Sequence, residues 1–404
     1  MRGTPGSPGF KGERLREARE SVGLTSVALA GMIGVTRQAL SLYESGGRTP
    51  GPDVLDKLVA SLGMPYEFFF RVPVHDNLGP VFYRSLAAAT KTARRKAEQR
   101  FEWLYEIVVA IEEAVELPVT DLPRWKRGDP LGLTSNDIEE AASTTRKHWG
   151  ISDGPVPDLC DHAERRGVVI SQFVMESDDL DAFSCWPKNS PRPFVLLNAE
   201  KGSAARLRLD TAHELGHQIL HHEVEPAQAR RPEIHKLMEQ QAFRFGSALL
   251  MEAGFFLDDV DAVSLDYLRT LKPTWGVSIG AMIFRLRDLD VIDQDECKRL
   301  WRTYTMRGFR REEPLDDKME AERPRLLSQA VETIGGPQKL LALLRSRIVL
   351  PDRLYEELLG LPGGAMAAPT LPPKTRLRQD AGSESDNPSG GDVVPFRRNG
   401  DEDS

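Results

Sequence analysis

The stretch RLRLDTAHELGHQILHH, residues 206–222, contains the strongest structural and chemical pattern in the sequence. Its apolar residues recur at the three- and four-residue spacing of a helix with a buried face. His213 and His217 lie four residues apart, on one side of that helix, so both imidazoles can reach one metal ion. Glu214 follows the first histidine, where its carboxylate can take a proton from a water molecule that the metal activates. The stretch therefore predicts a zinc-binding helix with a general base. The alternative is a helix that carries two histidines without a metal.

A catalytic zinc also needs a third protein ligand and one open position. His221 is excluded on a straight helix, because about 12 Å would separate it from His213, whereas zinc–nitrogen bonds measure about 2 Å. Glu239 is the better candidate, since it lies on the apolar face of a helix predicted over 236–251, where a carboxylate needs a partner. The alternative is that Glu239 lies in solvent at the edge of that face. Two weaker candidates are Glu223 and Glu225.

A second pattern, over residues 26–45, is typical of two short helices that cross steeply. Ala30 provides the small side chain at the crossing, and Gly34 provides the positive φ of the tight turn. Thr36 is placed to cap the second helix. Polar side chains on and around that helix can contact base edges and phosphates. The alternative is a small helical domain that binds only protein. The candidate DNA-binding residues are Thr25, Ser26, Thr36, Arg37, Gln38, Ser41 and Arg48.

Composition limits the class of protein. The chain of 404 residues has a hydrophobic content of 40%, a charged content of 28% and a net charge of −8, as in a protein with ordinary buried cores. Its three cysteines form no CxxC pair, and its Gly/Pro-rich N-terminus lacks the apolar core of a signal peptide. No apolar run is long enough for a bilayer. These features predict a cytoplasmic protein that does not contact a membrane.

The order of the periodic segments predicts a mainly α protein with a small β-sheet, in the α+β class. Helical periodicity covers about 86–115, 135–149, 205–222 and 232–251. Ser135 or Asn136 is the expected N-cap of the second of these helices, and Gly150 its stop. Short strand-like runs at 167–170, 181–184 and 194–197 are separated by turn residues, as in a small sheet.

These segments divide the chain into an all-α DNA-binding domain, a zincin-like peptidase domain and a helical C-terminal region. Residues 1–72 carry nine basic and seven acidic side chains, a balance of only +2. Such a weak field predicts modest DNA affinity for one copy, so a homodimer is expected. The predicted segments are a disordered N-terminus over 1–11, the helix-turn-helix domain over 12–72, a linker and helical connector over 73–134, the peptidase domain over 135–265, the helical C-terminal region over 266–361 and a disordered tail over 362–404.

The first of these domains resembles the Xre or phage-repressor type of helix-turn-helix. The likeness extends over about 60 residues and includes the Y-E-x-G element at Tyr43–Gly46. Ser26 departs from that type, which often has Gln there.

Residues 206–222 and the following EQQAFRFGSALLM, 239–251, resemble the ImmA/IrrE family of zinc metallopeptidases, as do the segments upstream of them. The family pattern continues from HExGH to E-x-x-A-x-x-F-A-x-x-L-L-M-P. Gly246 departs from the usual Ala and Glu252 from the usual Pro. The resemblance implies that His213, His217 and Glu239 bind Zn²⁺ and that Glu214 is the general base.

Family members cleave repressor proteins, so the resemblance implies a transcriptional regulator with a zinc endopeptidase domain. Its expected partners are a double-stranded DNA operator and a protein substrate, either a repressor or the chain itself. The alternative is a transcription factor whose catalytically silent metallopeptidase-like domain senses a ligand. Arg206 and Arg208, which precede the histidines, are expected either to stabilise an oxyanion or to pair with nearby acids.

Overall fold

The N-terminal part of the chain is a compact helical bundle. The computed structural model describes residues 6–74, 81–83 (backbone only), 90–125, 129–151, 153–176, 180–200 and 202–367. The bundle buries Leu15, Leu29 and Leu40 completely. Its elements are α1 (Gly12–Ser21), α2 (Ser26–Ile33), α3 (Arg37–Glu44), α4 (Pro52–Leu62) and the 3₁₀ helix η1 (Tyr66–Phe70).

The turn between α2 and α3 has the predicted geometry. Gly34 ends α2 with a φ of 72°, a left-handed conformation that favours glycine. Thr36 caps α3, because its side chain accepts a hydrogen bond from the backbone N–H of Ala39. Ala30 is buried at the crossing of the two helices. The local sequence therefore specifies both the break and the restart of the helix.

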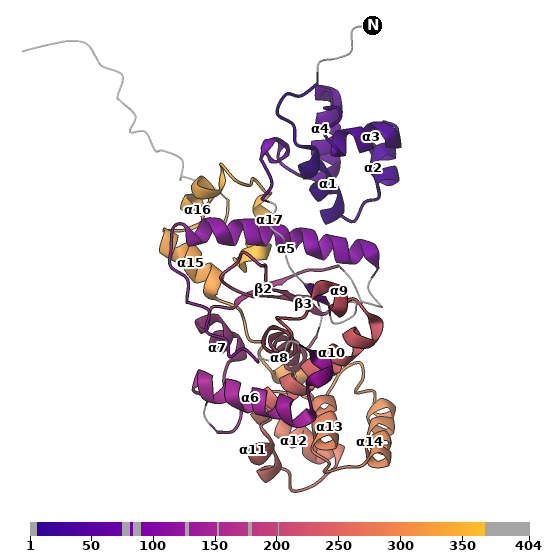
Figure 1. Cartoon of the computed structure of the whole chain (residues 1–404), viewed down its shortest axis with the longest axis vertical. Helices are drawn as coiled ribbons and strands as arrows, with labels where there is room; N and C mark the ends of the chain where they lie inside the picture. Colours follow the sequence, from indigo (N-terminus) through magenta and orange to yellow (C-terminus); the bar gives the residue numbers. More distant parts are fainter. Residues whose placement is uncertain are drawn as a thin grey trace, which may run out of the picture. The chain divides into compact units, whose positions relative to one another are not determined.

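Helix α5 (Lys91–Glu112) is buried on two sides. Towards the N-terminal bundle, the ring of Trp103 packs edge-on against Phe68, with 5.7 Å between the ring centroids. Towards the sheet, Phe101 packs in the same manner on Phe194 at 5.3 Å. One helix thus joins the N-terminal bundle to the rest of the structure (Figure 1).

A buried ion-pair cluster fixes that junction. Arg14 of α1 is fully buried and donates from Nη1 to Glu17 Oε2 and from Nη2 to Glu106 Oε2 of α5, both at 2.7 Å. Trp103 Nε1 donates to Glu17 Oε2 at 3.2 Å. Burial works to lower the pKa of Arg14, but its hydrogen bond to Glu106 and the charge of Glu17 raise that pKa above the ordinary value. We call these four residues the Arg14 cluster.

The sheet has four strands in the order β1-β3-β4-β2. β3 runs antiparallel to both neighbours, whereas β2 and β4 are parallel, with Ile170 opposite Val195. The predicted strands are found within three residues of their expected ends, and the α+β class is confirmed. The sequence pattern did not indicate β1. The strands are β1 (Val81–Tyr83), β2 (Val169–Phe173), β3 (Ala182–Cys185) and β4 (Phe194–Asn198).

The two faces of the sheet belong to different cores. Phe183 and Phe194 face α5, whereas Ala182 and Val195 belong to the core that contains α8 (Ala204–Leu220). This alternation along each strand follows from the two-residue period of extended chain. The metal-binding stretch predicted from the sequence therefore lies on a helix that packs against the sheet (Figure 1).

The remaining helices complete both cores. Most of those up to residue 306 join the core that contains α8, whereas α9 packs on α10. The last three return to the α5 side, where Ser171 Oγ of β2 donates to the Leu358 carbonyl at 2.7 Å. The remaining helices are η2 (Pro130–Gly132), α6 (Ser135–Trp149), α7 (Leu159–Arg165), α9 (Pro226–Ala229), α10 (Pro232–Leu250), α11 (Ala253–Asp258), α12 (Leu265–Trp275), α13 (Ile279–Asp288), α14 (Gln294–Met306), η3 (Asp316–Lys318), α15 (Leu326–Ile334), α16 (Pro337–Leu344) and α17 (Asp352–Leu359).

The predicted cap of α6 is wrong. Neither Ser135 nor Asn136 caps this helix; both lie inside it. Thr134 is the N-cap, because its side chain accepts from the backbone N–H of Asp137 at 3.2 Å while the Asp137 carboxylate accepts from the backbone N–H of Thr134 at 2.8 Å. These two reciprocal hydrogen bonds favour a helix that begins after Thr134 over one that begins a residue later. Gly150 ends the helix as expected, with a φ of 66°.

The two segments predicted to be disordered, 1–11 and 362–404, each include residues that the structure describes, namely 6–11 and 362–367. Phe10 is buried in the N-terminal core, and Met366 is buried near the end of the described chain, where its backbone N–H donates to Glu356 Oε1. Residues 1–5 and 368–404 lie outside the described residues.

Candidate functional site

The residues of the HELGH stretch are deeply buried in α8. His213, Glu214 and His217 expose 2%, 0% and 1% of their surfaces. The apolar residues around them hold the helix in the core, with Ala212 and Leu215 fully buried. Because His213 and His217 are one turn apart, their rings meet edge to face at a centroid distance of 4.8 Å.

Helix α10 approaches α8 so closely that two glycines lie at the contact with little room for a side chain. A Cβ on Gly216 would lie 3.1 Å from the Ala242 Cα, and a Cβ on Gly246 would lie 2.9 Å from the His213 backbone nitrogen. An added methyl group would force the helices apart. The departure of Gly246 from the usual Ala thus has a structural reason. The close contact also brings Glu239, three residues before Ala242, up to the histidines.

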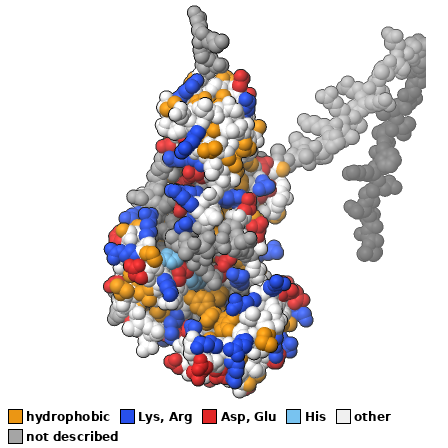
Figure 2. All heavy atoms as spheres, turned by 90° about the vertical axis from the view of Figure 1, so that its right-hand side faces the viewer, with side chains coloured by type: hydrophobic (Ala, Val, Ile, Leu, Met, Phe, Trp, Pro, Cys, Tyr) orange, Lys and Arg blue, Asp and Glu red, His pale blue; other side chains and the backbone are white. Residues whose placement is uncertain are grey.

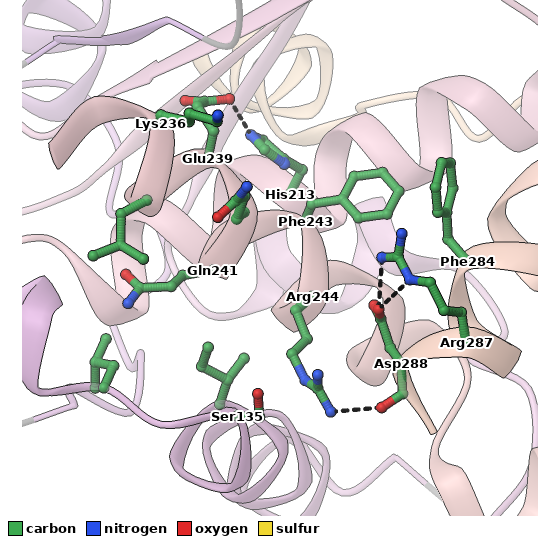
Figure 3. A pocket seen from close by; sticks show the side chains of 14 residues that line it. Ser135, His213, Lys236, Glu239, Gln241, Phe243, Arg244, Phe284, Arg287 and Asp288 are labelled. Atoms are coloured by element: carbon green, nitrogen blue, oxygen red, sulfur yellow. Dashed lines mark hydrogen bonds and ion pairs between the residues drawn. The ribbon is translucent and has the colours of Figure 1, made fainter. Parts of the chain in front are cut away.

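The structure brings the three predicted metal ligands together. His213 Nε2 and His217 Nε2 are 3.1 Å apart. Glu239 Oε2 lies 3.2 Å from His213 Nε2, and its Oε1 lies 3.1 Å from His217 Nε2. The Glu239 side chain is 18% exposed, so the group opens to solvent on the carboxylate side. We call these three residues the metal group; Figure 3 shows His213 and Glu239 at the edge of a pocket.

The metal group fits a tetrahedral ion. Two ligand atoms at about 2.0–2.1 Å from zinc, separated by a tetrahedral angle, lie about 3.3 Å apart, close to the three separations observed. Burial, and to a smaller extent the nearby His235, lower the pKa of His217 to about 3, so this ring is neutral at pH 7. A neutral imidazole offers one acceptor nitrogen and a carboxylate offers acceptor oxygens, so a cation suits the meeting point of the three side chains.

His221, rejected as a ligand on helix geometry, contacts His217 from behind. Its Nδ1 lies 3.1 Å from His217 Nδ1, and its Nε2 lies 2.9 Å from Gln241 Oε1. Gln241 Nε2 donates to the Pro130 carbonyl at 2.6 Å, which turns Oε1 towards His221. His221 must then donate from Nε2 and accept at Nδ1 from His217. This order of protons leaves the lone pair of His217 Nε2 facing the metal group.

Three other polar residues near the site have specific partners. His235, which the sequence analysis did not single out, is one turn before Glu239 on α10, with its Nε2 3.7 Å from Glu239 Oε1. The four-residue spacing was visible in the sequence, but His235 has no motif of its own. Arg206 pairs with Asp181 at 3.2 Å, and Arg208 pairs with Glu322. The two arginines thus follow the acid-pairing alternative.

A cavity of about 640 Å³ opens beside the metal group. His213 and Glu239 lie at one end, and Phe243 and Phe284 lie towards the other (Figure 3). A cavity of this size can hold several residues of an extended polypeptide or a small molecule.

The predicted DNA-contacting residues lie on the surface of the N-terminal bundle. Arg37, Gln38 and Ser41 project from α3 and are exposed, as are Thr25, Thr36 and Arg48, whereas Ser26 is half-buried. Thr25 also caps α2 by accepting from the backbone N–H of Ala28 at 3.2 Å. These side chains therefore lie on and around the second helix of a helix-turn-helix pair, the arrangement that reads a DNA groove.

The structure therefore defines two classes of domain in one chain: a helix-turn-helix that presents an exposed polar helix, and a metallopeptidase-like domain with a buried HExxH helix. Comparison with models of known families finds a helix-turn-helix over residues 15–69 and an IrrE N-terminal-like domain over residues 163–287. No curated protein matches the chain. The chain is thus a fusion of the two predicted domain types, in a DNA-binding regulator. Among the described helices, none combines the length and apolar character needed to cross a membrane.

Proposed function

We propose that the protein is a transcriptional regulator with a zinc-dependent endopeptidase domain. The observation that carries this proposal is the convergence of His213, His217 and Glu239 within 3.1–3.2 Å of one another on two helices. Such a group, with one side open to a cavity, matches a catalytic zinc site rather than a closed structural one.

The chain's own residues account for the chemistry. A zinc ion supplies Lewis acidity towards a peptide carbonyl and lowers the pKa of water. Glu214, next to His213 on α8, accepts the proton of the attacking water and delivers it to the departing amine nitrogen. His221 and Gln241 hold His217 in the tautomer that leaves Nε2 without a proton. The core buries His213, Glu214 and His217, whereas the Glu239 side stays open to the cavity.

We further propose that a double-stranded operator is bound by Arg37, Gln38 and Ser41 in the groove, with the neighbouring polar residues on phosphates. The small positive charge of residues 1–72 favours a homodimer, which doubles the contacts. The protein substrate is a repressor or this chain itself, and DNA binding would bring the peptidase domain to the regulated locus.

Glu214→Gln tests the enzymatic part. The variant keeps the shape of the side chain but cannot accept a proton, so zinc content and operator binding should stay unchanged while proteolysis stops. The substrates to test are the product of the adjacent gene and the chain itself, with zinc and after chelation, by mass spectrometry of the fragments. Unchanged cleavage by Glu214→Gln would remove the proposed base. A zinc-loaded chain that cuts neither substrate would favour the ligand-sensing alternative.

A further inference from the structure

A groove continues from the metal group across three helices. The cavity beside His213 shares Phe284 with two neighbouring hollows of about 540 and 680 Å³, and those two hollows share Trp301. Figure 2 shows hydrophobic side chains gathered in a hollow near the histidines, with Lys and Arg side chains around it. We call the surface formed by Phe243, Phe284 and Trp301 the aromatic groove.

The floor of the aromatic groove is a row of half-buried rings. Phe243 of α10 and Phe284 of α13 are 5.7 Å apart, and Phe284 and Trp301 of α14 are 4.9 Å apart. All three residues keep part of their surface in solvent. Contiguous apolar surface of this kind, left open in a cavity, is typical of a binding site. The rings meet at 84° and 44°, so they form no flat platform for stacking nucleic-acid bases.

The groove also carries unmatched positive charge. The Arg310 guanidinium lies 6.0 Å from the Trp301 ring centre, and its Nε donates to Thr305 Oγ1. Arg310 is exposed, and no carboxylate of the described ranges lies within ion-pair distance of it. Lys272 pairs with both Glu313 at 2.8 Å and Asp316 at 2.6 Å, in the hollow of about 540 Å³. The hollow of about 680 Å³ contains Arg310 and has no acidic residue in its lining. The far end of the groove thus attracts an anion.

We propose that the aromatic groove selects the polypeptide substrate, by taking a large aromatic side chain close to the cleaved bond and an acidic residue further along. The proposal rests on the proposed function. Glu239 and Phe243 are one turn apart on α10, about 6 Å, which equals about two residues of extended chain. The selected aromatic residue therefore lies within about two positions of the bond that faces the metal group. The acidic residue lies further along the peptide, at the end of the groove where it can pair with Arg310.

The test uses the full chain, first without metal and then loaded with zinc. The probes are fluorescein-labelled Gly/Ser peptides that contain Phe followed by two Asp residues, with matched versions in which Ala replaces Phe or Lys replaces Asp. Fluorescence anisotropy should show about tenfold weaker binding when either feature is removed, with or without metal. Equal binding of the three peptides would overturn the proposal. A single-stranded oligothymidine that binds more tightly than the Phe-Asp peptide would assign the groove to nucleic acid instead.

Two charge-reversal variants, one after the end of α14 and one on it, sharpen the result. Arg310→Glu should reverse the preference from the Asp to the Lys peptide, whereas Arg302→Glu, an exposed position outside the groove, should change neither. Identical effects of the two substitutions would reduce the selectivity to net charge and overturn the proposal. Zinc-loaded protein should also cleave the Phe peptide with a higher kcat/KM than the Ala peptide. Cleavage of both peptides at the same rate would contradict the proposed selectivity of the aromatic groove and leave the peptidase proposal standing. Selective binding without cleavage would contradict the peptidase proposal and leave the selectivity of the groove standing.

Discussion

The Arg14 cluster and the metal group are both buried assemblies of ionisable side chains, yet their electrostatics are opposite. In the Arg14 cluster, one guanidinium lies between Glu17 and Glu106, and every short contact joins a donor to an acceptor. In the metal group, two imidazole nitrogens and a carboxylate face one another at 3.1–3.2 Å. The first assembly is complete within the chain and holds domains together. The second gathers three possible ligand groups that suit a cation supplied from solution.

The largest expected effect comes from a substitution that breaks the Arg14 cluster. Glu106→Ala leaves the Arg14 charge buried with only Glu17, and we expect a loss of about 3–5 kcal/mol in the free energy of unfolding. Arg299→Ala is the matched control, because it removes an exposed pair with Glu296 and should cost less than about 1 kcal/mol. Urea unfolding of both variants measures the difference. Equal losses would mean that the Arg14 cluster acts as an ordinary surface pair.

The next effect concerns the incomplete assembly. Zinc at 100 times its Kd should stabilise the wild-type chain by about 2.7 kcal/mol, and Glu239→Ala should lose most of that gain. Glu233→Ala, an exposed acid on the same helix, should keep it. Thermal unfolding with and without zinc, together with the bound metal content, gives the answer. Zinc stabilisation that survives Glu239→Ala would place the ion elsewhere.

A smaller effect tests the close approach of α8 and α10 that assembles the metal group. Gly246→Ala places a methyl group 2.9 Å from the His213 backbone nitrogen, so we expect a loss of about 1–3 kcal/mol and weaker zinc binding. Gly31→Ala adds a methyl group on α2 with no atom within 4 Å, and should stabilise by up to about 1 kcal/mol. Denaturant unfolding compares the two. A neutral Gly246→Ala would show that the helices separate at no cost.

The smallest expected effect is a change in zinc affinity, and it comes from His221, which contacts His217 on the side away from Glu239. His221→Leu removes the acceptor for His217 Nδ1, and we expect zinc affinity to fall 10- to 100-fold. His221→Asn keeps both an acceptor and a donor and should recover part of it. Competition with a zinc chelator measures both affinities. If the Leu and Asn variants bind zinc equally, His221 serves packing alone.

The same contrast explains how much the sequence could predict. The metal group could be predicted from the sequence because His213 and His217 share one helix and Glu239 lies on the apolar face of another. Periodicity alone reveals such placements. The helix-turn-helix could also be predicted, because the residues that define it, Ala30, Gly34 and Thr36, lie within a few positions of one another.

Features that depend on contacts between distant parts of the chain could not be predicted from the sequence. Glu106 is 92 residues from Arg14, and nothing local marks it as the partner of that arginine. β1 has three residues, too few for a period, and exists through its pairing with β3. At Thr134 the error was local: several neighbouring residues can cap a helix, and only the reciprocal bond with Asp137 decides which one does.

The two-sided burial of α5 limits where the protein can be cut for separate study. A truncated chain that starts at residue 73 would lack Phe68 and Arg14. The indole of Trp103, completely buried in the intact protein, would then meet water, and Glu106 would lose its counterion. We expect such a fragment to self-associate, so the peptidase half is best assayed with its DNA-reading half attached and silenced by substitutions on α3.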